Sequence, residues 1–130
     1  MTPHELSVRV YYEDTDVGGV VYYANYLRFA ERARTEMLRA AGFHHAQNFT
    51  ETGIGFVVAK AHIEYRVPAH IDDLLTVRTE VERIGGASLD LRQDVYRGET
   101  LLAEMKITIV SVDRAGKAVK LPEGLRQIFQ

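Results

Sequence analysis

The sequence predicts an α+β domain in which one long helix packs against an antiparallel sheet of about five strands. Three observations predict this fold: apolar residues alternate in several segments, one segment has a helical repeat, and glycine-containing turns join the later strands. A chain of 130 residues, 46% hydrophobic and 26% charged, fits one domain spanning residues 1–130. Because the strands mostly follow the helix in the chain, the helix should cover one face of the sheet.

The first two elements are a strand and the long helix. Residues 5–12 alternate apolar side chains with Ser7 and Arg9, which is typical of a half-buried strand, and a glycine-containing loop follows at 13–19. From Tyr23 to Ala41 apolar residues recur every three to four positions, which predicts a helix that ends before Gly42. The stripe expected to face the sheet is Tyr26, Leu27, Ala30, Ala33, Met37, Leu38 and Ala41.

Four later segments alternate in the same way, at residues 61–67, 75–82, 88–96 and 101–112. The connection at 44–55 is expected to be a polar loop. Pro68 is expected to end the strand predicted at 61–67. Gly85 and Gly86 predict a hairpin turn, Gly98 predicts another, and Pro122 predicts the start of a short terminal helix.

Composition excludes several kinds of function. The chain has no cysteine, so carboxylates, hydroxyls and histidines remain for any chemistry. Its formal net charge of -2 gives no basic surface for nucleic acid. The first residues show no leader-like pattern and no apolar run is long enough to span a membrane, so we expect a cytoplasmic protein. The histidines lack metal-ligand spacing, and we expect no metal and no cofactor.

The segment 11–26 carries the strongest indication of chemistry. It holds three acidic residues, two glycines and five tyrosines between a strand and a helix. Gly18 and Gly19 allow close approach of a ligand to the backbone, and the helix start offers unpaired N–H groups. A carboxylate beside such donors has the two parts that acyl transfer needs. The residues alone leave an alternative open, in which Asp14 and Asp16 only favour a turn and the helix start.

The same segment resembles a known signature. Residues 14–26, with the stretches 10–16, 31–38 and 68–74, are similar to the 4-hydroxybenzoyl-CoA thioesterase family and, more narrowly, to its YbgC-type, Tol-Pal-associated acyl-CoA thioesterases. The resemblance implies a hot-dog fold, with the long helix wrapped by the antiparallel sheet. It also implies that two subunits pair their sheets edge to edge, that dimers often form tetramers, and that active sites lie at the subunit interface.

The resemblance also implies roles for particular residues. Asp16 is the implied catalytic carboxylate, either attacking the thioester carbonyl to give a mixed anhydride or activating a water molecule. The backbone N–H of Tyr23, at the helix start, is the implied donor that polarises the carbonyl. Tyr12 is expected to line the site. Gly18, Gly19 and Tyr26 are also expected to bind the substrate, and hydrophobic packing is left open as an alternative or additional role for Tyr26.

Two positions depart from the pattern. Tyr23 stands where many YbgC-type sequences carry a histidine, so a backbone donor survives but an imidazole role does not. Residues 85–87 stand where some hydroxybenzoyl-CoA enzymes have basic residues that contact CoA phosphates. Lys60, Arg66 and Arg83 are left as candidates for that contact by charge alone.

Three functions remain in view. The first is hydrolysis of a short-chain aliphatic or aromatic acyl-CoA to a free acid and CoA, with acyl carrier protein as an alternative carrier. The second, a hot-dog dehydratase, is disfavoured because those enzymes typically pair a histidine with an acid. The third is a non-catalytic module that binds acyl thioesters or a partner of the envelope or lipid-synthesis machinery.

Overall fold

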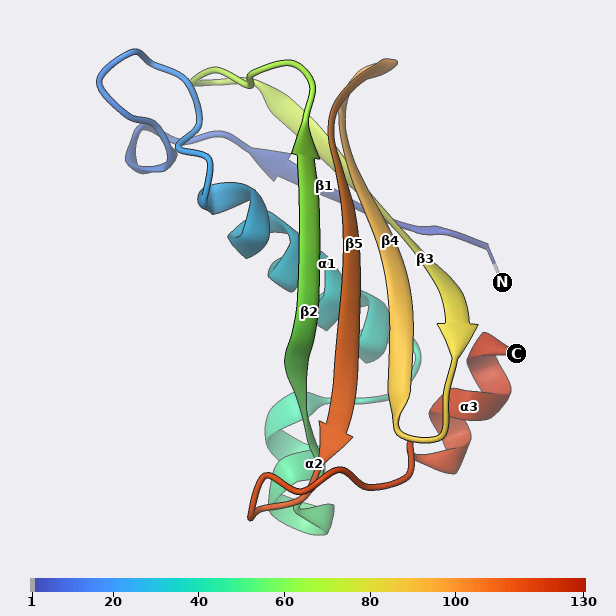
Figure 1. Cartoon of the computed structure of the whole chain (residues 1–130). Coiled ribbons are helices and arrows are strands. Elements are labelled where there is room, and N and C mark those ends of the chain that lie inside the picture. The colour runs from blue at the N-terminus through green and yellow to red at the C-terminus, as the bar shows by residue number, and fades with distance from the viewer. Residues whose placement is uncertain (1) are drawn as a thin grey trace.

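The computed structural model of the chain describes residues 2–130, which form one five-stranded sheet and three α-helices (Figure 1). The strand order is β1-β3-β4-β5-β2, and every neighbouring pair is antiparallel. The elements are β1 (His4–Arg9), a short 3-10 helix η1 (Tyr12–Asp14), α1 (Asn25–Ala40), α2 (His45–Thr52), β2 (Gly55–Tyr65), β3 (Leu74–Ile84), β4 (Ser88–Arg97), β5 (Thr100–Val112) and α3 (Glu123–Phe129).

The long helix α1 crosses one face of the sheet, as the sequence predicts (Figure 1). Phe29 and Met37 on α1 are each 1% exposed, and burying such side chains contributes roughly 1.5–3 kcal/mol each. The prediction for Leu27 was wrong, because that side chain is 39% exposed. Asn25 and Arg34 lie on the buried face of α1 instead. Their burial is compensated because each side chain forms a hydrogen bond there.

The first strand is shorter than predicted. β1 ends at Arg9, and the N–H and carbonyl of Val10 then bond to the carbonyl of Asp73 and the N–H of Asp72, both at 2.9 Å. The chain turns from there into η1, where Tyr12 is 83% exposed. Tyr12 therefore does not continue the inward-facing side of the strand.

The region 44–55 contains a helix, so the prediction of a loop was wrong. The side chain of Asn48 accepts the N–H of His44 at 2.8 Å at the start of α2, and Gly53, with φ of 76°, ends it. β2 begins at Gly55, six residues before the predicted start at 61, because Phe56, Val57 and Val58 form an apolar run without alternation. It ends at Tyr65, ahead of Pro68.

The two outer strands of the sheet differ in length and exposure. β1 has 6 residues, whereas β2 has 11 and leaves Val57 and Val58 about half exposed, at 49% and 50%. Tyr65, at the far end of β2, is also half exposed at 47%. The long edge strand thus presents apolar side chains and unpaired backbone groups together.

The remaining turns follow the prediction. Gly42 has φ of 94° just after α1, and Pro122 caps α3, which buries Leu125 and Phe129. Within residues 2–130 no helix is both long and apolar enough to cross a membrane.

Candidate active site

The loop between β1 and α1 is a narrow hairpin that presents Asp16. The N–H of Asp16 donates to the carbonyl of Val20 at 3.0 Å, and the N–H of Tyr22 donates to the carbonyl of Asp14 at 2.9 Å. At the tip, the N–H of Gly19 returns to the carbonyl of Asp16 at 3.1 Å. Gly19 has φ of 76°, a conformation that favours glycine, so the loop sequence fixes this tip.

The carboxylate of Asp16 is exposed, and only one of its two oxygens accepts a hydrogen bond from the described residues. Its Oδ1 accepts the N–H of Gly18 at 3.0 Å, which fixes the direction of the side chain. Its Oδ2 has no hydrogen-bond partner among residues 2–130. A carboxylate held on one oxygen and free on the other is available to attack a carbonyl or to take a proton from water.

The hairpin is tied to the segment that follows β2. The N–H of Val21 donates to the carbonyl of Ala69 at 2.8 Å, and the N–H of Ile71 donates to the carbonyl of Gly19 at 3.1 Å. On the other side, the buried amide of Asn25 donates to the carbonyl of Asp14 at 2.8 Å. Asp16 therefore projects from a loop that is anchored at both ends.

Asp73 holds this supporting segment in place. It accepts the N–H of His70 at 2.9 Å and the guanidinium of Arg97 at 2.8 Å. Burial raises the pKa of Asp73, but these hydrogen bonds and the charge of Arg97 outweigh it and bring the pKa below its usual value. The carboxylate thus stays ionised and keeps the residues that carry the hairpin fixed.

Tyr23 lies in a turn two residues ahead of α1, whereas the sequence placed it at the helix start. The helix begins at Asn25, whose own N–H bonds to the carbonyl of Tyr22 at 2.9 Å. The N–H of Tyr23 has no acceptor among the described residues. Its carbonyl accepts the phenolic O–H of Tyr65 at 3.0 Å. The turn therefore leaves the backbone N–H of Tyr23 unused close to the Asp16 hairpin in the chain.

Tyr26 is a packing residue in this chain. It is 3% exposed, and its hydroxyl accepts the N–H of Ala69 at 3.2 Å. Its ring meets the rings of Tyr65 and Phe29 with centroids 5.4 Å and 6.1 Å apart. Burial raises its pKa. A substrate contact by Tyr26 stays a prediction.

Tyr12 lies at the start of η1 with its ring in solvent. Its carbonyl accepts the hydroxyl of Thr15 at 2.7 Å, which ties it to the hairpin. No hydrogen bond or ring contact within residues 2–130 joins the Tyr12 side chain to Asp16 or Tyr23. Its place in the site also stays a prediction.

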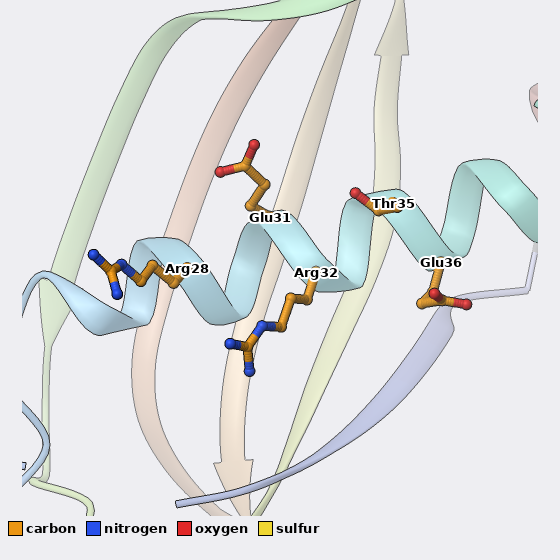
Figure 2. A pocket seen from close by; sticks show the side chains of 5 residues that line it. All are labelled: Arg28, Glu31, Arg32, Thr35 and Glu36. Atoms are coloured by element: carbon orange, nitrogen blue, oxygen red, sulfur yellow. The ribbon is translucent and has the colours of Figure 1, made fainter. Parts of the chain in front are cut away.

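Five cavities of about 210 to 390 Å³ are lined by residues other than Asp16 and Tyr23. One of about 310 Å³ lies on the outer side of α1, and Figure 2 shows its five side chains rising from that one helix, with Glu31 and Arg32 leaving it in opposite directions. Asp16 and Tyr23 are thus exposed on this chain and lie outside all five cavities.

The structure adds residues that sequence reasoning missed. Tyr65 was predicted only as part of the alternating strand 61–67, and Asn25 was given no role of its own within the segment 11–26. Both bind carbonyls of the hairpin and turn. A polar residue at the base of an apolar stripe was the one signal available for Asn25.

The basic residues considered for CoA phosphates differ in their surroundings. Arg66 is paired with Glu64 at 2.9 Å and Glu104 at 2.6 Å. Lys60 and Arg83 form no ion pair among the described residues. Residues 2–130 contain no group of three histidine, aspartate or glutamate side chains placed to hold a metal ion.

Comparison with known proteins identifies the fold and the family. The model of the thioesterase-like superfamily matches residues 10–129. The acyl-CoA thioesterase YbgC of Haemophilus influenzae is 44% identical over 123 residues, covering 94% of this chain and 90% of that protein. The acyl-CoA thioester hydrolase YbgC of Escherichia coli O6:H1 is 50% identical over 107 residues, covering 82% and 79%. A solved structure of a probable thioesterase from Bartonella henselae superposes with a TM-score of 0.90 at 39% identity, covering 93% of this chain and all of that one.

A long helix wrapped by an antiparallel sheet, with these neighbours, defines a hot-dog protein of the thioester hydrolase class. The chain belongs to the thioesterase-like superfamily, and the resemblance to YbgC-type thioesterases seen in its sequence is confirmed.

Proposed function

We propose that the protein hydrolyses a short-chain aliphatic or aromatic acyl-CoA to a free acid and CoA, with Asp16 and the N–H of Tyr23 acting on the thioester. The observation that carries the proposal is that one anchored loop presents a carboxylate oxygen of Asp16 at its tip and the backbone N–H of Tyr23 in the turn that follows, both without partners among the described residues. The names of the YbgC relatives, which are acyl-CoA thioesterases, support the choice of substrate.

The reaction uses these two groups differently. The N–H of Tyr23 would donate to the thioester oxygen as negative charge develops there, and losing one such donor typically costs about 100 to 1,000-fold in turnover. The free Oδ2 of Asp16 would attack the carbonyl carbon, or take a proton from the water that attacks it. If Asp16 attacks, the C–S bond breaks as the acyl–Asp16 anhydride forms, and a water molecule then hydrolyses the anhydride to the carboxylic acid and free Asp16. If water attacks instead, it gives the carboxylic acid directly. In both routes the CoA thiolate leaves and takes up a proton that comes from water.

A second copy of the chain would complete the site. The edge strand β2 carries half-exposed Val57, Val58 and Tyr65, and a two-fold pairing through β2 would cover them and satisfy its free backbone groups. The exposure of Asp16 on one chain also supports a site finished by a neighbour. We therefore propose a homodimer joined edge to edge, with a homotetramer as the larger alternative.

Thiol release from a panel of acyl-CoA thioesters tests the activity. The panel contains acetyl-, butyryl-, hexanoyl-, palmitoyl-, benzoyl- and 4-hydroxybenzoyl-CoA, with the matching acyl carrier protein thioesters as a second arm. Turnover of a short or aromatic acyl-CoA supports the proposal. Binding without release from any CoA or carrier-protein thioester would contradict it and favour the non-catalytic module.

Native mass spectrometry tests the assembly. Wild-type protein should be a dimer or tetramer, and Val58→Glu, which places a charge on the edge strand, should give monomers with reduced turnover. His62→Glu, on the same strand, is the control for a change of charge, because that side chain is already polar and 70% exposed. A fully active wild-type monomer would contradict the interface.

A further inference from the structure

One of the five cavities, separate from the Asp16 hairpin, lies where α1, α2, β2 and β5 meet. Its volume is about 250 Å³, comparable to the liquid volume of about eight water molecules. Leu38, Phe56, Val58 and Ile109 give it apolar walls, and the side chain of Arg34 lines it from α1. Neither Asp16 nor Tyr23 lines this cavity.

Arg34 is unusual for a residue in such a wall. It is 7% exposed, and its one hydrogen bond in the described chain runs from Nη1 to Oε1 of Gln93 at 3.1 Å. Gln93 is itself fixed, since its Nε2 donates to the carbonyl of Ala30 at 2.9 Å and to the hydroxyl of Thr79 at 3.0 Å. A guanidinium has five N–H donors, so most of the capacity of Arg34 is unused inside the protein.

The charge of Arg34 is poorly compensated. Among residues 2–130 no carboxylate lies within 4.0 Å of its guanidinium. Burial lowers the pKa of Arg34, and the negative charge of Glu31, which lines the same cavity, raises it in part. Keeping a cation in an apolar wall is costly unless an acceptor meets it, so a bound acceptor oxygen would be stabilised there.

His45 adds a second polar group to the same cavity. Its ring lines the space and meets the ring of Phe56 at 6.5 Å, and its Nε2 is buried without a partner in the described chain. Burial, and then the charge of Arg39, lower its pKa, so the ring is neutral near pH 7. Arg34 is therefore the cation of this cavity, with Glu31 as its one acidic neighbour in the lining.

The edge pairing proposed above would place this cavity beside the hairpin of a second copy. Arg34 is nine residues along α1 from its first residue, Asn25, or about 13.5 Å at the helical rise, and Tyr23 lies two residues before the helix. This separation is too long for a short acyl group within one chain. The Tyr23 turn is tied to Tyr65 at the end of β2, whereas the cavity borders Phe56 and Val58 at its start. Antiparallel pairing of two β2 strands brings the end of one beside the start of the other.

We infer that this cavity receives the far end of the substrate's acyl group and that Arg34 selects acyl groups that end in an oxygen acceptor. The chemical class is a short acyl chain or ring with a terminal carboxylate or hydroxyl, whose apolar stem packs on Leu38, Val58 and Ile109. This inference rests on the proposed thioesterase function and on the edge-paired dimer.

The test compares matched acyl-CoA pairs with the wild-type protein. Adipoyl- against hexanoyl-CoA adds a terminal carboxylate, and 4-hydroxybenzoyl- against benzoyl-CoA adds a hydroxyl. We expect kcat/KM to be at least about tenfold higher for one or both oxygen-bearing members, the range of a charged hydrogen bond. A larger ratio for the first pair identifies a carboxylate ligand, and a larger ratio for the second identifies a hydroxyl.

Arg34→Met then tests the assignment to this residue. It keeps the apolar stem of the side chain and removes the donors, so the ratio within each pair should fall toward one. Arg32→Met, an exposed arginine on the same helix, is the matched control and should keep the ratio. If Arg34→Met does not fold, the wild-type ratios still test the selection itself, because ratios near one would overturn it.

The outcomes separate this inference from the function on which it rests. Turnover of both members of each pair with ratios near one would overturn the role of Arg34 and leave the thioesterase intact. A ratio that survives Arg34→Met would overturn the assignment to Arg34. Absence of turnover with every thioester would instead overturn the proposed function.

Discussion

The phenolic O–H of Tyr65, at the end of β2, donates to the carbonyl of Tyr23 at 3.0 Å. This hydrogen bond joins the sheet's edge strand to the turn that carries the proposed oxyanion donor. The rings of the two residues also meet edge to face, with centroids 6.3 Å apart. The strand proposed to form the dimer interface therefore also holds the turn proposed to polarise the substrate.

Replacement of Tyr65 by phenylalanine should lower turnover more than stability. Tyr65→Phe removes the hydrogen bond but keeps the ring, so the turn at Tyr23 becomes freer while the packing remains. A net hydrogen bond contributes about 0.5–1.5 kcal/mol, so kcat should fall by up to about tenfold. Steady-state kinetics measure this, with Tyr96→Phe as the control because its hydroxyl has no partner in the described chain. Equal effects from the two variants would contradict the role.

Replacement of Tyr26 by phenylalanine should destabilise the fold. The Tyr26 hydroxyl accepts the N–H of Ala69, and its loss leaves a buried donor unsatisfied at a cost of about 1–3 kcal/mol. Urea unfolding of Tyr26→Phe measures this loss. Tyr11→Phe, at a position 60% exposed, should leave the free energy of unfolding unchanged. An unchanged midpoint for Tyr26→Phe would show that the hydroxyl is not needed there.

The two glycines of the hairpin should respond differently to alanine. Gly19 has φ of 76°, so Gly19→Ala should cost about 1–2 kcal/mol and move the Asp16 loop, lowering kcat. A Cβ at Gly18 would lie 3.6 Å from Oδ1 of Asp16, an ordinary contact, so Gly18→Ala is the milder matched change. Unfolding and turnover of both variants test this order, and equal losses would contradict it.

Acid should weaken the fold through His45. Because burial lowers the folded pKa of His45, the unfolded chain takes up the proton first as the pH falls. The stability that the neutral, buried His45 ring contributes is complete above the ordinary histidine pKa of about 6.5. It is lost as the pH falls from there through the lowered pKa of His45 in the folded protein. The free energy of unfolding should therefore drop between pH 7.5 and 5.5, and less so in His45→Gln.

The control for this pH dependence is His62→Gln, at a side chain that is 70% exposed. That variant should keep the wild-type loss of stability on acidification. Identical pH profiles for wild type and His45→Gln would show that burial of the His45 ring does not drive the loss.

Sequence patterns predicted most of the fold because the inner strands largely alternate between buried and more exposed side chains. Met105, Ile107 and Ile109 occupy alternate positions of the predicted strand 101–112 and are all buried. The start of β2 was missed because Phe56, Val57 and Val58 lie on an edge strand and do not alternate. α2 was missed because eight mostly polar residues give a weak helical repeat.

The site was predictable only in part, for a different physical reason. The hairpin stood out through its acids and glycines, and resemblance pointed to Asp16 and Tyr23 within it. Tyr65 reaches Tyr23 across 42 positions of sequence, and Gln93 reaches Arg34 across 59. Such long-range hydrogen bonds depend on the register of the folded sheet, which local patterns do not contain.

Loss of thiol release on replacement of Asp16 tests its role as the catalytic carboxylate most directly. Asp16→Asn keeps the acceptor for Gly18 and removes the charge, whereas Asp14→Asn changes a neighbouring carboxylate whose Oδ2 only accepts the N–H of Tyr11. With the best acyl-CoA substrate of the panel, Asp16→Asn should lower kcat by about 100-fold or more and Asp14→Asn should change it little. A folded Asp16→Asn protein with wild-type turnover would contradict the assignment of Asp16 as the catalytic carboxylate.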